Sequence, residues 1–354
     1  MDKVVYVIGA GFSAPLGIPA MGNFLFKSKD IYFDDPDRYT HFSQVFETIN
    51  KLSVTKNYYN CDLFNIEEIL SIIEMNEFLE GNKLKADFIN YIKDVIIFYT
   101  PEIQCVGGNV TGDWLDFLFG ENSATALYGY FVASLMRLDF QRKNSDQFHT
   151  NRVYDLVAEL SPQKRAKYSV LSLNYDMVLE TMASAINKKY INDCNIEFCK
   201  SKYDPTWNST HLAKLHGCLS DDEIVPPTWA KGTHQSIVPI WKNAFKLLND
   251  ANHIRFIGYS LPVADSYIKY LLKAAVIASP HLKSLDVICL DSDGSTKSRY
   301  DNFFEFNNYR FENGSVTDYL QELKNHVDSS ANRQQDYVST SHLETAHDIF
   351  MRNA

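Results

Sequence analysis

Short runs rich in apolar residues, most of them ending at glycine or a polar residue, mark the expected strands of this chain. The first run, residues 3–8, is β-branched and aromatic without polar alternation, which is typical of a strand buried on both faces of a parallel sheet. Comparable runs occur at 168–173, 213–217, 254–257 and 285–290, and 308–311 adds an expected edge strand. The pattern predicts an α/β fold: a Rossmann-like parallel sheet with helices on both faces.

Apolar residues recur at spacings of three and four over residues 38–160, which predicts helices. The segment is too long for one crossover, so we read it as a large helical insertion. Residues 1–37 and 161–327 would then form the sheet domain. From residue 328 to 354 the chain is polar, and we expect a peripheral C-terminal tail with one terminal helix near its end.

The short run Asp30–Asp35 has two interpretations. It can be a strand ending in an acid that binds a ribose, which would favour a dehydrogenase. It can also be a surface turn, and the sequence Asp35-Pro36-Asp37 favours the turn.

Composition narrows the function. The formal net charge of -10 argues against direct nucleic-acid binding, because phosphate contacts need a basic surface. The six cysteines form no C-x-x-C pair, which predicts reduced thiols and no zinc site. No apolar run approaches the roughly 20 residues needed to span a bilayer. The chain starts directly in the first strand without a leader, so we expect a cytoplasmic protein.

The first strand is followed by a glycine-rich turn, in which Gly9–Ala14 fits the G-x-G-x-x-A pattern of dinucleotide sites. Glycines allow a sharp turn and leave N–H groups for a phosphate, although such a turn can also serve packing alone. Ser13 adds a hydroxyl. Pro15, Gly17 and Pro19 prevent a long regular helix, unlike the loop of a dehydrogenase.

Other strand ends also carry polar or small residues that a parallel sheet would bring to one rim. Asn174 and Asp176 can line a ligand site or simply cap the next helix. His216 can be a satisfied structural histidine or can face a cleft. Residues 258–260 form a small-residue turn, and Asp291 can bind a ribose or serve ordinary turn chemistry.

Together these motifs resemble the sirtuin superfamily, whose members cleave NAD at the nicotinamide glycosidic bond. The matching segments are 9–13 with 17–19 (opening loop), 174–176 (Asn-x-Asp), 214–217 (catalytic His-Gly) and 258–261 (Gly-x-Ser nucleotide loop). The resemblance covers the sheet from residue 1 to about 295 and leaves out 38–160. Two features depart from the protein-deacylating sirtuins: the zinc module is missing, and Met21–Phe24 stands where an arginine is usual.

The amino-acid sequences of four segments are similar instead to those of the bacterial sirtuin-like NADases of antiviral defence. These segments are 174–176, 214–217, 226–229 (Pro-Pro-Thr-Trp) and 258–262. The resemblance implies hydrolysis of NAD that depletes the infected cell, an abortive-infection response. It also implies a homo-oligomer held off until an activating partner engages it, such as an ATPase, a helicase or a nucleic-acid-guided protein.

The resemblance also implies roles for single residues. Asp176 would hold the carboxamide, Asn174 the ribose hydroxyls and a water, and His216 would act as the base. The expected NAD-binding residues are Gly9, Ala10, Gly11, Ser13, Pro19, Gly258, Ser260 and Asp291, with no metal. NAD would be the substrate. The alternatives are a sirtuin-type NAD-dependent protein deacylase and a noncatalytic sensor of NAD or ADP-ribose, with a dehydrogenase behind both.

Overall fold

The structure is a computed structural model. The structure describes residues 1–52, 65–81, 84–103, 118–119, 124–144, 154–162, 166–190, 192, 194–200, 202–204, 209–217, 219, 224–225, 236–263, 265–277, 279–331 and 336–353. The expected segment 226–229 therefore lies outside the described residues.

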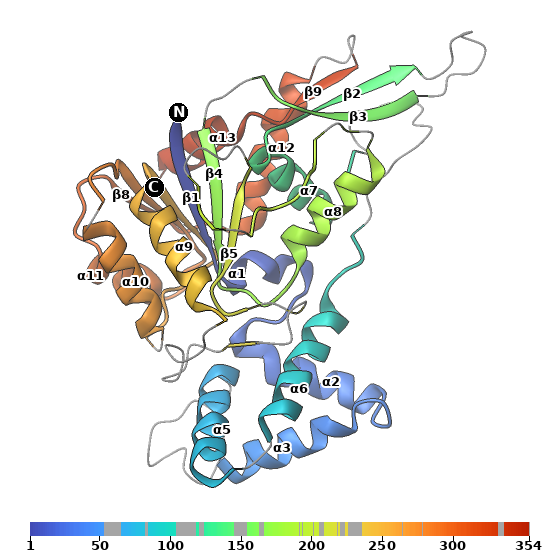
Figure 1. Ribbon diagram of the computed structural model, residues 1–354, viewed down its shortest axis with the longest axis vertical. Coiled ribbons are helices and arrows are strands. Elements are labelled where there is room, and N and C mark those ends of the chain that lie inside the picture. The colour runs from blue at the N-terminus through green and yellow to red at the C-terminus, as the bar shows by residue number, and fades with distance from the viewer. Residues whose placement is uncertain are drawn as a thin grey trace.

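A six-stranded parallel sheet with strand order β5-β4-β1-β6-β7-β8 forms the centre of the molecule (Figure 1). Its strands are β1 (Asp2–Ile8), β4 (Ala166–Ser172), β5 (His211–Lys214), β6 (His253–Ile257), β7 (Ser284–Ile288) and β8 (Tyr309–Glu312). The order reverses at β1. Strands β4 and β5 lie on one side of β1, and β6, β7 and β8 lie on the other side. Ligands of such sheets bind beyond the carboxyl ends of the strands, next to the reversal.

β1 is buried on both faces because helices cover both faces of this sheet. Its even-numbered apolar residues pack with α7 (Ala124–Leu135), α8 (Val178–Lys189), α12 (Val316–Ser330) and α13 (Leu343–Phe350). Val5 and Val7 point the other way, toward α9 (Val238–Asn249), α10 (Ser266–Ile277) and α11 (Ser295–Phe303). The predicted α/β fold, with a Rossmann-like sheet between helices, is confirmed.

A group of helices lies below the carboxyl ends of the strands in Figure 1. It consists of α2 (Phe24–Asp34), α3 (Thr40–Leu52), α5 (Ile66–Glu80) and α6 (Leu84–Tyr99). Phe42 and Tyr91 lie fully buried between them, with ring centroids 4.8 Å apart. The Tyr91 hydroxyl donates a 2.7 Å hydrogen bond to Ser28 Oγ, which joins α6 to α2. The buried residues of this group are continuous with the core on one face of the sheet.

The strand interpretation of Asp30–Asp35 was wrong, because Asp30 to Asp34 belong to α2, and the predicted turn comes only after this run, at residues 36–39. The buried residues of α2 are Phe24, Leu25, Ser28 and Ile31, which share one helical face. Of the three apolar residues inside the acidic run, Ile31 continues that face, whereas Phe33 is 75% exposed. No strand here places an acid at a ribose.

The reading of 38–160 as helical was only partly correct. Leu138–Asn144 (β2) and Tyr154–Leu160 (β3) form an antiparallel pair, and Tyr337–Ser339 (β9) from the C-terminal segment adds to β2. In β2, Leu138 and Phe140 are buried on one face of the strand, and Asp139 between them is buried too, where it accepts hydrogen bonds from Tyr337 and Ser339 of β9.

The C-terminal segment is not peripheral, which corrects the prediction. Leu343, Ala346 and His347 of α13 are buried, and α13 packs against α12. Arg255 of β6 forms a twofold ion pair with Glu344 of α13, with N–O distances of 2.8 Å. Within the described residues, no helix is long and apolar enough to cross a bilayer, and no group of three or more His, Cys, Asp or Glu is placed to hold a metal ion.

Candidate active site

The glycine turn after β1 is locked against the turn after β6. The N–H of Gly9 donates to the carbonyl of Ile257 (3.1 Å), and that of Gly11 to the carbonyl of Gly258 (2.9 Å). Gly258 has φ +62°, and a Cβ added to it would lie 2.3 Å from the nitrogen of Phe12. These glycines therefore allow two backbones to meet. The two N–H groups that the sequence suggested for a phosphate are already used, which corrects that expectation.

The predicted interruption of the first helix is confirmed. A single helical turn, α1 (Ala10–Ser13), passes into a 3₁₀ turn at Ala14–Leu16. Gly17 ends it with φ +91°, in the left-handed region that glycine adopts without strain. The last residue of this short helix, Ser13, is buried beside the loop that follows β4.

Ser13 connects the two polar residues that follow β4. Its hydroxyl donates a 2.7 Å hydrogen bond to Asp176 Oδ2 and accepts one of 3.0 Å from Asn174 Nδ2. Asn174 Nδ2 also donates to the Gly9 carbonyl at 3.0 Å. Asp176 Oδ1 accepts from the N–H of Val178, the first residue of α8. Asp176 is thus both a helix cap and part of the cluster, while Ser13 lies inside the cluster and not at an open phosphate position.

One oxygen of this cluster has no donor among the described residues. Asn174 is 7% exposed, and no hydrogen-bond donor of the described residues reaches its Oδ1. An unsatisfied buried acceptor costs about 1–3 kcal/mol, so its presence needs a reason. The orientation of the amide is fixed, because both hydrogens of Nδ2 have acceptors. The Oδ1 atom is therefore held ready for a donor from a ligand or water.

A buried lysine holds the same loop from behind. Lys214, the last residue of β5, donates from Nζ to the main-chain carbonyl of Asp176. Its Nζ lies 3.6 Å from Glu180 Oε1, so the charge has a partner although the side chain is 6% exposed. The ammonium group fixes the loop after β4 to β5, two residues before His216.

His216 lies at the carboxyl end of β5, where its side chain lines a cavity. Its carbonyl accepts from the N–H of Val225 at 2.9 Å, and the preceding Leu215 N–H donates to Ser172 of β4. The imidazole ring centroid lies 6.0 Å from that of Tyr175. The histidine is 2% exposed, so it faces the cavity rather than bulk solvent.

The cavity that His216 lines has a volume of about 640 Å³, within the size range of small-molecule and cofactor sites. It extends across the carboxyl ends of the strands. Its lining includes Gly9, Ala10, Gly11, Leu173, His216, Gly258, Ser260, Leu290 and Thr317. The expected residues of the turn after β1, the turn after β6 and the histidine are thus brought to one cavity.

A smaller cavity of about 50 Å³ adjoins it and is lined by Ser13, Pro19, Asn174 and Asp176. Ala10, Met21 and Leu173 line both cavities and form the wall between them. The small cavity has space for only a few water molecules. The Asn174 cluster and His216 therefore lie on two sides of a thin wall.

Two carboxylates that the sequence did not reveal line the larger cavity. Glu67, at the start of α5 in the helical group, accepts a 3.3 Å hydrogen bond from the Tyr175 hydroxyl. Asp265, just before α10, accepts one of 2.8 Å from the Tyr259 hydroxyl. Burial, and then the nearby carboxylates, raise the pKa of both tyrosines well above the ordinary value. Both stay neutral donors. The only local signal was Asn65, which caps α5.

Asp291 has a different role from the one expected. Its two carboxylate oxygens accept from the N–H groups of Thr296 (3.1 Å) and Lys297 (2.9 Å), at the start of α11. It does not line the cavity, although its neighbour Leu290 does. The turn interpretation was correct, and the expected place at a ribose is corrected. Ser260 does line the cavity, and Arg299 donates to its carbonyl at 2.9 Å.

The N-terminus of α12 also faces the cavity, and the sequence gave no hint of it. Gly314–Thr317 line the cavity, and the Ser315 side chain caps the helix by accepting from the Asp318 N–H at 3.0 Å. The first turn of a helix carries N–H groups without intrahelical acceptors and a partial positive charge. No Lys or Arg is found among the described lining residues, so this helix end is the positive element of the cavity.

Residues 168–312 match the family model described as SIR2-like domain. The matched segment runs from β4 to the end of β8, so it contains Asn174, Asp176, His216 and Gly258 but not the glycine turn after β1. The match supports the resemblance to the sirtuin superfamily. None of the curated proteins matches the chain in sequence.

Three solved structures illustrate what the chain is similar to. One is Sir2 in complex with the inhibitor EX-527, 2'-O-acetyl-ADP-ribose and deacetylated p53 peptide (12% identity, 93% of this chain and 95% of that one, TM-score 0.34). Another is Sir2Tm bound to a propionylated peptide (12% identity, 93% of this chain and 94% of that one, TM-score 0.35). The third is Sir2 with p53 peptide and NAD⁺ (11% identity, 93% of this chain and 94% of that one, TM-score 0.32). These scores are low, so the fold assignment rests on the strand order itself.

Proposed function

We propose that this protein is an NAD⁺ hydrolase that cleaves the bond between nicotinamide and ribose and releases nicotinamide and ADP-ribose. The observation that carries the proposal is the position of the Ser13–Asn174–Asp176 cluster and His216 in two adjoining cavities, on either side of a thin wall. The SIR2-like segment contains three of these four residues. We further propose that residues 1–37 and 161–327 form the NAD-binding domain, with 38–160 inserted into it.

The proposed reaction consumes one water. The bond between ribose C1′ and the pyridinium nitrogen breaks, and its electron pair neutralises the nicotinamide. The water oxygen bonds to C1′, and the proton it loses passes to a base. In this scheme the His216 imidazole is the base, because an imidazole accepts protons near neutral pH. The Oδ1 of Asn174, which no donor of the described part of the chain reaches, would hold a ribose hydroxyl or the water.

The charges of the cavity suit this chemistry. NAD⁺ carries a positive nicotinamide ring, and the transition state moves positive charge onto the ribose. Glu67 and Asp265 line the cavity without a lysine or arginine among the described lining residues, so a cationic group is favoured there. The α12 N-terminus at Gly314–Thr317 is the element suited to the anionic diphosphate.

Asp176 is proposed to hold the nicotinamide carboxamide, which requires the small cavity to enlarge. At about 50 Å³ it does not have room for the ring. Pro19 and Met21 line it from the segment after Gly17, which is the side away from the sheet. We propose that this segment moves when NAD⁺ binds.

The proposed biological role is antiviral defence through depletion of NAD⁺. It is supported by the likeness of residues 174–176, 214–217 and 258–262 to the bacterial sirtuin-like NADases. We propose that the protein acts in the cytoplasm as a homo-oligomer that a partner protein activates, without binding nucleic acid directly. Induced expression with the partner should lower cellular NAD⁺ and arrest growth, and His216→Ala should prevent both.

The biochemical test uses purified protein with NAD⁺, alone and with an acetyl-lysine peptide, and separates the products by chromatography. Release of nicotinamide and ADP-ribose without peptide supports the hydrolase. Release that requires the peptide and yields acetylated ADP-ribose would instead establish a deacylase. NAD⁺ that binds tightly but stays intact, in the presence of the partner as well, would establish a sensor.

His216→Ala and Asn174→Ala are the informative variants, and both should lose hydrolysis by a hundredfold or more. His281→Ala is the matched control, since His281 is exposed and only its main-chain carbonyl accepts a hydrogen bond. All three should keep the wild-type circular dichroism spectrum and melting temperature within a few degrees. Near-wild-type turnover in His216→Ala would contradict the assignment.

A further inference from the structure

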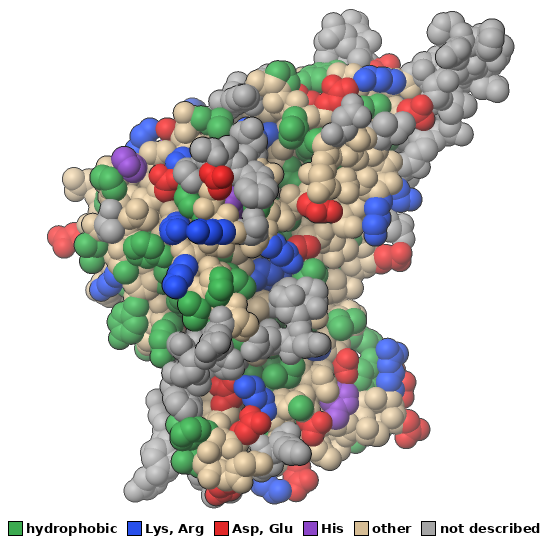
Figure 2. Space-filling view, viewed as in Figure 1, with side chains coloured by type: hydrophobic (Ala, Val, Ile, Leu, Met, Phe, Trp, Pro, Cys, Tyr) green, Lys and Arg blue, Asp and Glu red, His purple; other side chains and the backbone are tan. Residues whose placement is uncertain are grey.

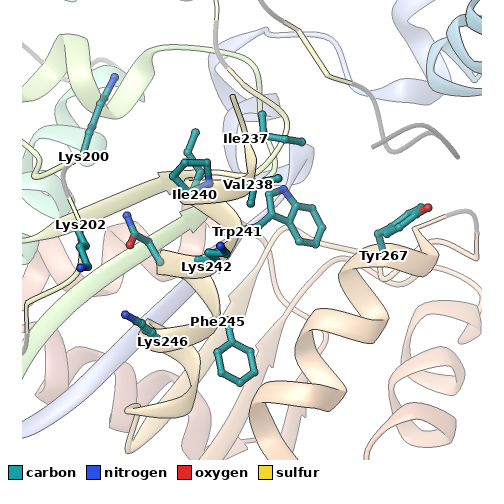
Figure 3. A pocket seen from close by; sticks show the side chains of 12 residues that line it. Lys200, Lys202, Ile237, Val238, Ile240, Trp241, Lys242, Phe245, Lys246 and Tyr267 are labelled. Carbon is teal, nitrogen blue, oxygen red and sulfur yellow. The ribbon is translucent and has the colours of Figure 1, made fainter. Parts of the chain in front are cut away.

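A second cavity of about 620 Å³ lies beside α9, outside the candidate active site. Figure 3 shows Lys200, Lys202 and Lys246 along one side of it and Trp241 and Tyr267 on the other. The apolar remainder of the lining consists of Ile237, Val238, Pro239, Ile240 and Phe245. We name this cavity the α9 groove.

The charge of the α9 groove is of one sign. Lys242 and Lys246 stand one helical turn apart on α9, and Lys200 and Lys202 approach from the segment before β5. No described lining residue is acidic. Lys200 lies 3.5 Å from Glu180, whereas Lys202, Lys242 and Lys246 have no ion-pair partner among the described residues. In Figure 2, Lys and Arg side chains gather over this part of the surface although the chain is acidic overall.

An apolar stripe on α10 continues the groove. Tyr267, which lines the groove, is followed on α10 by Tyr270, Ala274 and Ile277. These positions follow one helical face, and all four are exposed; Tyr270 is 69% and Ile277 85% exposed. Exposed apolar residues that form a continuous face mark a surface that another molecule covers.

The groove also touches the active site. Trp241 donates from Nε1 to the carbonyl of Leu215 at 3.0 Å, and Leu215 precedes His216. Tyr267 stands two residues after Asp265, which lines the larger cavity of the candidate active site. An occupant of the α9 groove would therefore lie next to both loops without entering the cavity.

We propose that the α9 groove and the α10 stripe dock an amphipathic acidic helix of a partner protein. Its apolar face would lie on Trp241, Phe245 and Tyr270. Its carboxylates would pair with the lysines that line the groove. A mononucleotide is a poorer fit, because the lysines form a spread row and not a convergent phosphate cradle, and because the apolar stripe extends beyond the groove. An apolar centre with a charged rim is the usual form of a helix-binding protein surface.

The test measures binding directly by fluorescence polarisation, without NAD⁺, so its result does not depend on the proposed hydrolase. The probe is a fluorescein-labelled 18-residue helical peptide with leucine and phenylalanine on one face and glutamate on the other. Two control peptides carry lysine in place of glutamate, or the same composition with the apolar face scrambled. We expect the acidic amphipathic peptide to bind at least tenfold more tightly than either control, and to bind His216→Ala as tightly as the wild type.

Two double variants locate the site. K242E/K246E should weaken binding at least tenfold, whereas K188E/K189E, which alters two exposed lysines of α8 by the same total charge, should leave it unchanged. Equal loss in both variants, or no binding of the acidic peptide to the wild type, would overturn the proposal. A wild-type dimer in sedimentation that becomes monomeric in Tyr270→Glu would also overturn it, because a second copy would then be the occupant.

Discussion

Ser13 and Asp176 are 163 positions apart in the chain, yet the hydroxyl of Ser13 donates a 2.7 Å hydrogen bond to Asp176 Oδ2. Both side chains are buried. The bond joins the turn after β1 to the loop after β4, the two neighbouring strands at the point where the sheet order reverses. The geometry of the Asn174–Asp176 loop thus depends on a residue that lies outside the SIR2-like segment.

Ser13→Ala should impair both stability and activity. It removes a donor from Asp176 and an acceptor from Asn174, which leaves buried polar atoms unsatisfied at a cost of about 1–3 kcal/mol. We expect the free energy of unfolding, measured in urea, to fall by that amount and NAD⁺ hydrolysis to fall roughly tenfold to a hundredfold. Ser43→Ala, at an exposed hydroxyl on α3, is the control and should change neither. Full activity in Ser13→Ala would argue against a fixed Asn174 cluster.

On the proposed mechanism, Glu67→Gln should slow NAD⁺ hydrolysis about tenfold with little change in stability, because it removes a negative charge from the cavity in which the proposed reaction develops positive charge. Tyr175→Phe separates charge from geometry. It removes the same hydrogen bond but keeps the carboxylate, and it should therefore have a smaller effect on kcat. The measurement is the steady-state rate of nicotinamide release. Equal losses in the two variants would mean that the hydrogen bond matters and the charge does not.

Gly258→Ala should be strongly destabilising. The residue has φ +62°, and the added Cβ would lie 2.3 Å from the Phe12 nitrogen, so the turns after β1 and β6 could no longer meet. Gly81→Ala is a matched control, because Gly81 has φ +72° but nothing lies within 4 Å of the added Cβ. Its cost should be about 1 kcal/mol, from backbone conformation alone. Thermal melts should show a clearly larger drop for Gly258→Ala, and similar drops would contradict the close approach.

Acid should destabilise the protein through a buried histidine. Burial, and then the charge of Arg255, lower the pKa of His347 to about 4 from the ordinary 6.5, despite Asp286 at 3.2 Å and the nearby Glu344. Tyr319 also faces this ring, at 3.3 Å. Between these pH values the unfolded chain binds the proton and the folded chain does not. Stability is therefore full above about pH 6.5 and falls as the pH drops toward 4, by about 3 kcal/mol.

Urea unfolding between pH 4 and 8 checks this expectation. His347→Gln keeps an amide donor near Asp286 but cannot titrate, so its stability should depend less on pH over this window. His281→Gln, at an exposed histidine, should retain the wild-type slope. The same slope in all three proteins would show that another group dominates. Asp286 acts in the same direction at lower pH, because hydrogen bonds from His347 and Arg310 outweigh its burial and lower its pKa.

The strands and strand-end motifs could be predicted because they depend on local properties. A run such as 3–8 fits only a doubly buried strand, and the prolines after Gly11 fit only a short helix. The errors came from segments in which the local pattern of apolar residues was compatible with both the period of a helix and the period of a strand. Ile31, Tyr32 and Phe33 follow one another in an acidic run, and only the packing of α2 shows that Ile31 continues a helical face. Leu138 and Phe140 similarly needed β3 and β9 as partners.

The sequence by itself determined the sheet, its polar strand ends and the residue types of the candidate site. Tertiary structure decided which of these residues meet. Ser13 joins Asn174 rather than an open phosphate position, Asp291 caps α11, and Glu67 reaches the cavity from a helix far along the chain. The physical reason is that hydrophobic periodicity and turn chemistry act over a few residues. The partners of a side chain are fixed only when distant elements pack and their buried polar groups must find donors and acceptors.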